Sequence, residues 1–275
     1  MKKIRTAFQG ELGAFSQEAV GQLLGDRATV APFQRFDEVF RALSDKSVDA
    51  AVIPIENTLA GSVYENFDLL QANNLHIVSE VSLRIVHNLI AMPGTTRKAV
   101  RQVYSHPVAL AQCQRFFAKN PKIERITYYD TAGSVKMLAE RRPPGAAAIA
   151  SRIAAEVYDA RILATHLEDH RENYTRFFLL SKTARVSPRA NKISIVFSTR
   201  NIPGALYKCL SVFALRDIDL TKMESRPLHG RPWEYSFYID FAGNVKEERC
   251  KKALDHLSEV TNFLRVLGCY EGAKR

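Results

Sequence analysis

Blocks of apolar residues separated by polar turns run through the first two thirds of the chain. Residues 3–8 alternate weakly, and residues 48–55 form a continuous apolar run that is typical of a buried strand. Ser16 has the position of a helix N-cap, and Ser62 with Glu65 has the spacing of a capping box. Strands alternating with helices favour an α/β fold with a mainly parallel sheet and helices on both faces. The pattern predicts further strands within 75–92, 102–105, 123–129 and 146–150 and further helices over 37–43, 63–70, 107–117 and after residues 131 and 151.

The pattern changes after residues 183–190, a short polar segment that we interpret as a linker. Beyond it Ile193, Ile195 and Phe197 alternate as a strand, and the later blocks predict helix, strand, strand, helix and strand in turn. The order β-α-β-β-α-β is that of a ferredoxin-like fold. Because helices cover only one face of such a sheet, we expect its other face or its edges to pair with a second copy of the chain.

Residues 168–180 join a charged segment to an apolar run through Asn173, Tyr174, Thr175 and Arg176. A polar loop that runs into a buried strand brings side chains to the mouth of a cleft. Thr175 can donate and accept a hydrogen bond, and Arg176 can bind a carboxylate through two parallel N–H groups. The alternative interpretation is a loop that caps the strand and leaves Arg176 in solvent.

Serine or threonine recurs at the turns that lead from a strand into a helix. Ligands of open α/β sheets bind beyond the carboxyl ends of the strands, where helix N-termini offer unpaired N–H groups. We therefore predict a site for an anion that carries carboxylates, although N-capping alone would explain any one of these residues. The residues are Ser16, Thr58, Ser62, Ser105, Thr131, Ser134 and Ser151.

Length and composition are those of a soluble globular protein. The 275 residues suffice for one large or two ordinary domains, with 46% hydrophobic and 25% charged residues. No run of about 18 apolar residues predicts a membrane span, so we expect no membrane partner. The basic N-terminus is not followed by an apolar segment, so we expect no signal peptide and a cytoplasmic location.

The formal net charge of +10 favours an acidic partner. The lysines and arginines are spread along the chain, and no block is dense enough for a nucleic-acid-binding arm. A small polyanionic substrate would suit this charge as well as a nucleic acid would, and a basic soluble surface needs neither. We expect no nucleic-acid partner.

The four cysteines, Cys113, Cys209, Cys250 and Cys269, are scattered and lack metal-ligand spacing. We interpret them as small core residues in a reducing compartment. His166 and His170 lie four residues apart but have no general-base pattern beside them. We therefore expect no metal site.

Five stretches together resemble the prephenate dehydratase family, and the resemblance covers essentially the whole chain. They are residues 7–19 (AFQGELGAFSQEA), 53–62 (IPIENTLAGS), 105–107 (SHP), 130–134 (DTAGS) and 173–177 (NYTRF). The C-terminal region is similar to an ACT domain, because NIPGAL and ESRP match the two motifs with which the family binds phenylalanine.

The resemblance implies a lyase of phenylalanine biosynthesis. It would remove the ring hydroxyl and the ring carboxylate of prephenate, giving phenylpyruvate, CO2 and water. Aromatisation drives that reaction, so no cofactor is implied. Two alternatives remain open: the same chemistry on arogenate, which has an amino acid in place of the pyruvyl group, and a non-catalytic ligand-binding regulator on the same fold.

The essential threonine of the family falls on Thr175, which would hydrogen-bond the leaving oxygen. Arg176 would hold a carboxylate, unless it braces the loop, and Phe177 would pack. Glu56 is expected to be structural, because its charge would repel a dianion. The substrate-binding residues that the resemblance implies are Asn57, Thr58, Ser105, His106, Thr131, Arg176 and Phe177.

The family fold has two α/β lobes like a periplasmic binding protein, with the active site between them. We therefore expect a catalytic domain at 1–182, with lobes of about 1–80 plus 175–182 and 81–174, and an ACT domain at 191–275.

L-phenylalanine is the implied effector. It would bind between the ACT domains of two subunits, in a homodimer or homotetramer, and favour a less active state. The residues that the resemblance implies for this site are Asn201, Gly204, Ala205, Leu206, Glu224, Ser225 and Arg226.

Overall fold

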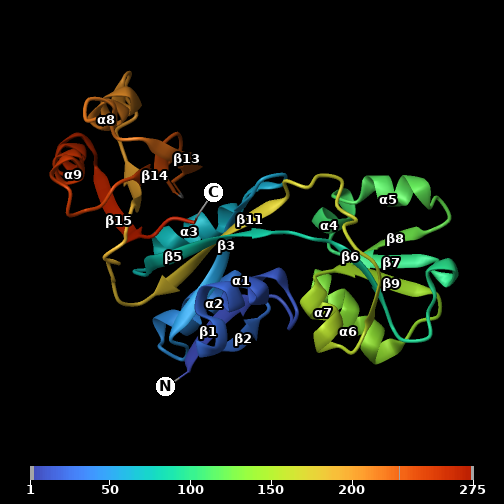
Figure 1. Cartoon of the computed structure of the whole chain (residues 1–275). Coiled ribbons are helices and arrows are strands. Elements are labelled where there is room, and N and C mark those ends of the chain that lie inside the picture. The colour runs from blue at the N-terminus through green and yellow to red at the C-terminus, as the bar shows by residue number, and fades with distance from the viewer. Residues whose placement is uncertain (1–2, 229, 274–275) are drawn as a thin grey trace.

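Three β-sheets, each with its own helices, form the molecule (Figure 1). A computed structural model describes residues 3–228 and 230–273. We call the first sheet with its helices lobe one, the second lobe two, and the third the ferredoxin-like domain. Within the described residues no helix is long and apolar enough to span a membrane.

Lobe one holds a six-stranded sheet in the order β2-β1-β3-β11-β5, with β4 paired to β3. Its strands are β1 (Ile4–Gln9), β2 (Ala28–Phe33), β3 (Ala50–Asn57), β4 (Gly61–Ser62), β5 (His76–Arg84) and β11 (Tyr174–Ser181). Its helices are α1 (Phe15–Leu24), α2 (Phe36–Ser44) and α3 (Tyr64–Ala72), with a 3-10 turn at Gly25–Arg27.

Lobe two holds a five-stranded sheet in the order β10-β6-β9-β7-β8. Its strands are β6 (Asn88–Ala91), β7 (Gln102–Ser105), β8 (Glu124–Thr127), β9 (Ala146–Ala150) and β10 (Arg161–Ala164). Its helices are α4 (Pro107–Ala111), α5 (Gln114–Lys119), α6 (Thr131–Arg141) and α7 (Arg152–Val157), with a 3-10 turn at Arg97–Ala99.

The expectation of one mainly parallel sheet is wrong, because the chain builds two mixed sheets. β1 pairs parallel with β2 and β3, and β7 pairs parallel with β8 and β9. β11 is antiparallel to both β3 and β5, and β6 is antiparallel to β9 and β10. The chain leaves lobe one after β5 and re-enters it as β11 (Figure 1), so the returning strand runs against its neighbours.

Two predicted helix caps are also wrong. The N-cap position of α1 is Ala14, so Ser16 lies inside the first turn. The N-cap position of α3 is Val63, and Ser62 belongs to β4. The Ser62 hydroxyl instead donates to Glu224 Oε2 at 2.5 Å, a carboxylate 162 positions away that local sequence spacing does not reveal.

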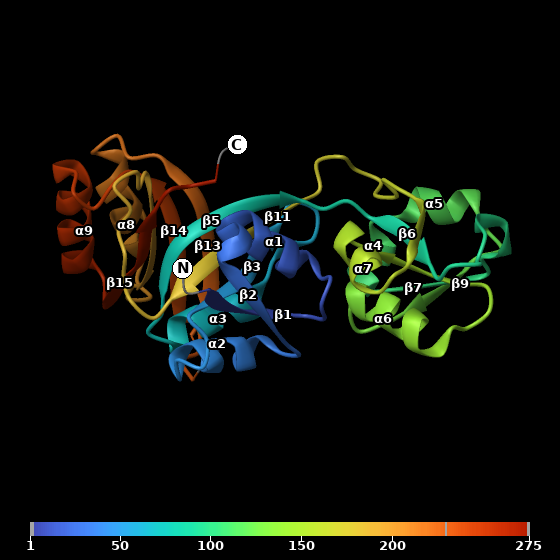
Figure 2. The same cartoon turned by 60° about the horizontal axis from the view of Figure 1, so that its bottom comes forward.

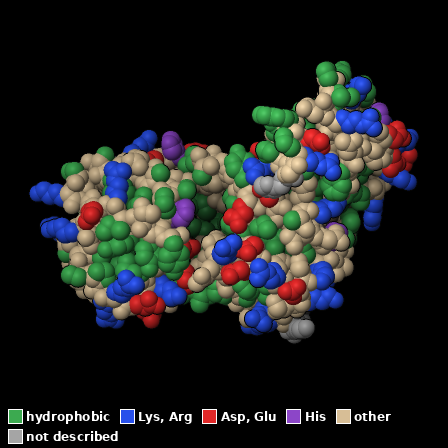
Figure 3. All heavy atoms as spheres, turned by 180° about the vertical axis from the view of Figure 1, so that it is seen from behind, with side chains coloured by type: hydrophobic (Ala, Val, Ile, Leu, Met, Phe, Trp, Pro, Cys, Tyr) green, Lys and Arg blue, Asp and Glu red, His purple; other side chains and the backbone are tan. Residues whose placement is uncertain are grey.

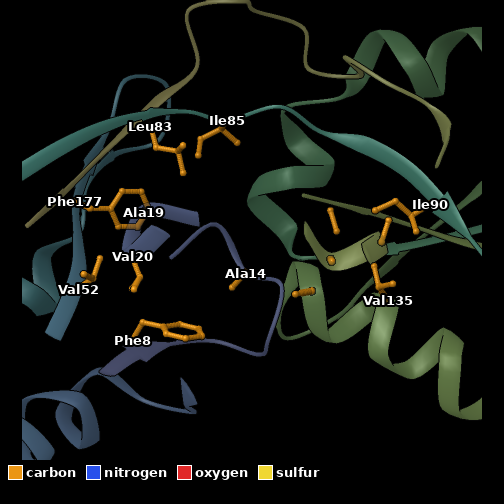
Figure 4. Close-up of a cluster of buried hydrophobic side chains, with 14 of the residues drawn as sticks. Phe8, Ala14, Ala19, Val20, Val52, Leu83, Ile85, Ile90, Val135 and Phe177 are labelled. Carbon is orange, nitrogen blue, oxygen red and sulfur yellow. The ribbon is translucent and has the colours of Figure 1, made fainter. Parts of the chain in front are cut away.

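The two lobes share one apolar cluster, in which Phe8, Val52 and Phe177 lie in lobe one and Ile90 and Val135 in lobe two (Figure 4). The loop after β1 bridges the lobes. Gly13 in this loop has φ +88, and a Cβ there would lie 2.6 Å from Ala154 Cα, so only glycine fits. Its carbonyl accepts a hydrogen bond from Ser151 Oγ at 2.5 Å.

The ferredoxin-like domain has the predicted β-α-β-β-α-β order and a sheet in the order β13-β14-β12-β15. Its elements are β12 (Lys192–Ser198), α8 (Ala205–Ala214), β13 (Leu220–Pro227), β14 (Tyr235–Ala242), α9 (Glu248–Val260) and β15 (Phe263–Tyr270). The four cysteines of the chain are free and buried, as expected.

Lobe one covers the face of this sheet that α8 and α9 leave free, as Figure 2 shows. Val196, Tyr238, Leu267 and Tyr270 from that face belong to the same apolar cluster as residues of lobe one. We expected the open face or the edges of this sheet to pair with a second copy of the chain. For the open face this expectation is wrong, because lobe one of the same chain covers it.

Candidate active site

A pocket of about 400 Å³ lies between the lobes. Figure 3, seen from behind, shows the hollow with apolar side chains inside it. Phe15, Ile85, Val108 and Ala109 provide apolar lining. The polar side chains that line the pocket are Asn57, Ser62, His87, His106, Gln112, Thr131 and Thr175. An apolar cavity with a few converging polar groups is the usual form of a small-molecule site.

A larger hollow, of about 720 Å³, lies at the loop before β11. Arg84, Arg115, His166 and residues 168–172 line it, and Thr175 does not. Its wall is made of charged and imidazole side chains with little apolar surface to enclose a ring. We therefore place the candidate active site in the smaller pocket.

Thr175 reaches the pocket from the first part of β11. Its Oγ1 accepts a hydrogen bond from Asn57 Nδ2 at 2.9 Å. Asn57 is the last residue of β3, which pairs with β11 so that Asn57 lies opposite Thr175. Sheet pairing therefore joins two residues that are 118 positions apart in the sequence.

Lobe two contributes the start of two helices. His106 is the N-cap of α4, and its Nδ1 accepts from Val108 N at 3.3 Å. Thr131 opens α6, whose N-cap Asp130 accepts from Gly133 N at 2.7 Å. The structure thus brings Asn57, His106, Thr131 and Thr175 together at the pocket. Their roles in binding or catalysis remain predictions.

Three other predicted site residues lie away from the pocket. Thr58 Oγ1 donates to Glu172 O at 2.6 Å and accepts from Tyr174 N at 3.0 Å, so it holds the turn onto β11. Ser105 is fully buried and donates to Ile149 O at 2.6 Å. Phe177 is buried in the shared apolar cluster. Each of these side chains is used by the fold. This corrects the assignment of Thr58 and Ser105 to the substrate and agrees with the packing expected for Phe177.

Arg176 is the main correction. Neighbouring side chains of a strand point to opposite faces, so Arg176 points away from Thr175 and towards the ferredoxin-like domain. Its Nη1 lies 2.5 Å from Asp240 Oδ2 and 3.2 Å from Glu80 Oε2, and its Nε lies 2.7 Å from Glu56 Oε1. Burial lowers the pKa of Arg176, but these carboxylates outweigh it and the pKa is raised. Arg176 is therefore the centre of an interdomain ion network.

Glu56 joins this network, in agreement with the expectation that it is structural. It also pairs with Lys222 of the ferredoxin-like domain. Glu80 is further paired with Lys192 at 2.5 Å, and Asp240 accepts from Ser194 Oγ at 2.5 Å. We call Glu56, Glu80, Lys192, Arg176, Lys222 and Asp240 the interdomain ion network.

The predicted effector residues divide between two faces of the third sheet. Glu224 accepts from Ser62, and Arg226 makes two bonds to Asp68, at 3.0 and 2.7 Å. Both therefore contact lobe one in this structure, and the assignment of these residues to an effector site remains a prediction. The structure places Asn201, Gly204, Ala205 and Leu206 around the start of α8 and Ser225 on β13.

The pocket is lined by neutral groups. The described lining residues include no lysine or arginine. Burial lowers the pKa values of His87 and His106, which keeps both imidazoles uncharged at neutral pH. Burial also raises the pKa of the neighbouring Asp130. The donors available in this pocket are thus neutral: hydroxyl, amide, imidazole and backbone N–H groups.

Sequence reasoning missed Gln112 and His87, and quoted Asn173 without a role. Asn173 is fully buried and donates to Gln112 Oε1 at 2.9 Å. In the sequence, the one indication of a role for Asn173 was its position in a polar stretch, directly before Tyr174 and Thr175. No local signal marked Gln112, which lies between α4 and α5. Within residues 3–228 and 230–273, no three His, Cys, Asp or Glu side chains are grouped to hold a metal ion.

Comparison with known proteins adds the family. The sequence model of the family described as prephenate dehydratase matches residues 6–185. The chain belongs to the prephenate dehydratase family. Arogenate dehydratase/prephenate dehydratase 2, chloroplastic, of Arabidopsis thaliana is 43% identical over 279 residues, which are 98% of this chain and 73% of that relative.

Solved structures agree over nearly the whole chain. The prephenate dehydratase of Arthrobacter aurescens in complex with L-Phe has a TM-score of 0.90 and 30% identity, over 97% of this chain and 90% of that one. A structure described as a novel type of quorum quenching acylase also has a TM-score of 0.90, with 33% identity over 97% of both chains. The chain is thus a lyase of the prephenate and arogenate dehydratases of phenylalanine biosynthesis, with the two-lobed fold that the resemblance implied.

Proposed function

We propose that the enzyme converts prephenate to phenylpyruvate, CO2 and water in the pocket between the lobes. The observation that carries the proposal is the pairing of Thr175 with Asn57 in an apolar pocket of a chain of this family. As the ring C–O bond breaks, the leaving oxygen gains negative charge, and a hydroxyl placed to donate to it stabilises that charge.

The neutral lining suits the loss of CO2. The ring carboxylate of prephenate gives up its charge as the electrons of its C–C bond enter the ring. A lysine or arginine bound to that carboxylate would stabilise the substrate more than the transition state, and would therefore slow the reaction. The described lining residues include neither. The apolar side chains also exclude water around the ring.

Arogenate is the second candidate substrate. Its ammonium group reduces the net charge from about −2 to about −1, which a pocket without lysine or arginine accepts at a lower cost of desolvation. The Arabidopsis relative carries the names of both activities. The chemistry at the ring is the same for both substrates, so Thr175 keeps the same role.

An acylase activity has less support. Acyl transfer by a Ser–His or Thr–His pair needs a hydroxyl nucleophile next to a histidine base. Among the described residues, the Thr175 hydroxyl is bonded to Asn57, and the Ser62 hydroxyl is bonded to Glu224 and Lys222. Neither hydroxyl contacts a histidine in these bonds.

Regulation by L-phenylalanine is part of the proposal. The Arthrobacter relative was solved with L-Phe, and the β-α-β-β-α-β domain of this chain is consistent with an ACT domain. An effector can shift the enzyme only by its difference in affinity for the active and less active states. An unchanged rate of the full-length chain in saturating phenylalanine would contradict this part. Dimer or tetramer formation and a cytoplasmic location remain predictions.

The experiment is steady-state turnover of prephenate and arogenate by the wild type, Thr175→Val and Thr175→Ser. Valine has the shape of threonine without the hydroxyl, so we expect kcat to fall about 10²- to 10³-fold with the fold intact. Serine keeps the hydroxyl, so we expect most of the activity to remain. Wild-type turnover of neither substrate, or an active valine variant, would overturn the proposal.

A further inference from the structure

Three side-chain amides form a closed ring of hydrogen bonds beside Thr175. Asn57 Nδ2 donates to Asn173 Oδ1 at 2.8 Å, Asn173 Nδ2 donates to Gln112 Oε1 at 2.9 Å, and Gln112 Nε2 donates to Asn57 Oδ1 at 3.4 Å. We call these three residues the amide ring. Asn57 ends β3, Asn173 immediately precedes β11, and Gln112 lies in the turn between α4 and α5, so the amide ring also joins the two lobes.

Backbone groups fix the direction of the amide ring. The oxygen and nitrogen of a side-chain amide are similar in shape, so the ring taken alone would close equally well in the opposite sense. The backbone N–H groups of Leu59 and Ala60 both point at Asn57 Oδ1, at 3.0 and 2.8 Å. A backbone N–H can only donate, so this atom of Asn57 must be the oxygen. The two hydrogens of Asn57 Nδ2 are therefore shared among Asn173 Oδ1, Tyr174 O and Thr175 Oγ1.

The direction of the ring decides how Thr175 is used. Asn57 donates to Thr175 Oγ1, so the hydrogen of the Thr175 hydroxyl must point elsewhere. No described residue accepts a hydrogen bond from this hydroxyl, and Thr175 lines the pocket. We propose that the amide ring holds Thr175 as a hydrogen-bond donor to the leaving hydroxyl of the substrate, with Asn57, Asn173 and Gln112 as positioning residues. This inference rests on the proposed function and assigns roles within it.

The donor role is consistent with the electron balance of the reaction. The ring C–O bond breaks with its electron pair on oxygen, while the pair of the bond to the carboxylate enters the ring and CO2 leaves. The departing oxygen receives a hydrogen bond from Thr175, leaves as hydroxide and takes a proton from solvent to become water. Thr175 keeps its proton. Donation from Asn57 polarises the Thr175 hydroxyl and strengthens the bond that it donates.

His87 completes the arrangement from lobe two. Its Nε2 lies 2.8 Å from Gln112 Oε1, which is an acceptor, so Nε2 carries the hydrogen. This fixes the neutral tautomer, and Gln112 Oε1 then receives hydrogen bonds from both His87 and Asn173. The backbone N–H of His87 donates a hydrogen bond to Glu168 Oε2 at 2.9 Å, and this carboxylate is the charged group near His87. The direction of the amide ring is thus set at Asn57 by two backbone N–H groups, and this direction in turn sets the tautomer of His87.

The test replaces the NH2 group of Asn57, which donates hydrogen bonds, with a carboxylate oxygen, which accepts them and has nearly the same shape. In Asn57→Asp the oxygen that faces Leu59 and Ala60 keeps its two N–H donors, and the other oxygen faces Thr175. The ionised carboxylate of this variant would attract the Thr175 hydrogen and turn it away from the pocket. We expect kcat to fall about 100-fold at pH 8, with KM changed less than about threefold.

The pH profile separates orientation from simple damage. The added proton must occupy the oxygen that faces Thr175, because the other oxygen is filled by N–H groups. Protonation therefore restores a donor at the original place. We expect the ratio of kcat for Asn57→Asp to kcat for the wild type to rise as pH is lowered from about 9 to about 5, since burial of the new carboxyl raises its pKa into this range.

A second variant and a control complete the experiment. Gln112→Glu keeps the oxygen that accepts from His87 and Asn173 and loses only the weaker donation to Asn57. We expect a fall of about tenfold in kcat. Asn73→Asp makes the same chemical change at the end of α3, outside the pocket, and should follow the wild type at every pH.

The outcomes distinguish this inference from the proposed function. A wild type that turns over neither prephenate nor arogenate would remove the proposed function itself. An active wild type with an Asn57→Asp variant of unchanged kcat, or with a ratio that stays flat over the same pH range, would overturn the donor role of Thr175 and leave the proposed reaction in place.

Discussion

The two faces of β11 carry opposite kinds of chemistry. Thr175 faces the pocket, whose described polar lining consists of hydroxyls, amides and uncharged imidazoles. Arg176, the next residue, faces the ferredoxin-like domain and is surrounded by Glu56, Glu80 and Asp240. The chain has a formal net charge of +10, yet none of its lysines or arginines lines the described pocket.

This difference shows that the two regions solve different physical problems. The reaction moves negative charge from a carboxylate to a leaving oxygen, so a neutral donor of fixed direction helps the transition state more than a fixed cation does. The contact between lobe one and the ferredoxin-like domain has a different requirement: it must keep the two surfaces in a single relative position. Paired and hydrogen-bonded buried charges penalise alternative arrangements, because misplacing one partner leaves the other charge without compensation.

Arg176→Met should have the largest effect on the contrast between the two faces of β11. This change leaves Asp240 and Glu80 buried without their arginine, so we expect about 3–5 kcal/mol less stability in urea unfolding followed by circular dichroism. KM should remain within about threefold of the wild type at a temperature where the variant is folded. Arg35→Met, which removes an exposed pair with Asp37, is the matched control and should leave the urea midpoint nearly unchanged.

A different result would support the original assignment of Arg176 as a substrate-binding residue. If KM rose tenfold or more while the urea midpoint stayed unchanged, Arg176 would contact the substrate during turnover. The interdomain ion network would then be a resting arrangement, and the division of β11 into a neutral and an ionic face would fail.

A smaller effect should appear in the pH dependence of stability through His87. Burial lowers the pKa of His87 in the folded protein. Below about pH 6.5 the unfolded chain binds a proton that folded His87 does not, so protonation favours unfolding. Stability from this group is therefore full above about pH 6.5 and is lost as pH falls towards the folded pKa, by up to about 1.4 kcal/mol per pH unit.

The measurement compares urea unfolding of the wild type and His87→Gln between about pH 7.5 and about pH 5.5. Glutamine keeps an N–H for Gln112 but does not titrate, so the variant should lose less stability than the wild type as pH falls. If the stability of both proteins fell equally with pH, His87 would not be held neutral in the folded protein. The pocket could then no longer be described as lined by uncharged groups.

Ser62 gives the smallest expected effect, because it belongs to both regions. It lines the pocket, and its hydroxyl donates to Glu224 Oε2 at 2.5 Å. We expect Ser62→Ala to cost about 1 kcal/mol in urea unfolding and to change kcat/KM by less than about threefold. Ser258→Ala, which removes an exposed hydroxyl from α9, is the control. A loss of more than tenfold in kcat/KM with normal stability would make Ser62 a substrate contact.

Much of the local structure followed from the sequence because it depends on local patterns. The alternation of Ile193, Ile195 and Phe197 predicted β12, and the β-α-β-β-α-β order of the third sheet came from successive patterns of the same kind. Ser151 was expected at a turn into a helix and is the N-cap of α7, with its hydroxyl accepting from Ala154 N at 3.1 Å. Such features are decided within a few residues.

The candidate site was less predictable because its bonds join distant residues. Thr58 and Ser105 have the right chemistry for a substrate, but their hydroxyls bond to backbone carbonyls of Glu172 and Ile149. Gln112 carries no local mark of function and becomes visible only when Asn57 and Asn173 lie beside it. A hydroxyl or an amide does not reveal its partner through its neighbours in the sequence.

Local patterns in the sequence predicted the α/β class and the β-α-β-β-α-β order of the third sheet, because periodic burial can be recognised from the residues alone. A dense cluster of motif residues singled out Thr175 as the candidate catalytic residue. The antiparallel return of β11 between β3 and β5 could not be predicted from local patterns and is seen only in the folded molecule. That placement turns Thr175 to the pocket and Arg176 to the ferredoxin-like domain. The physical reason is the two-residue period of a strand: adjacent residues must face opposite sides, and only the packed neighbours decide what each side is for.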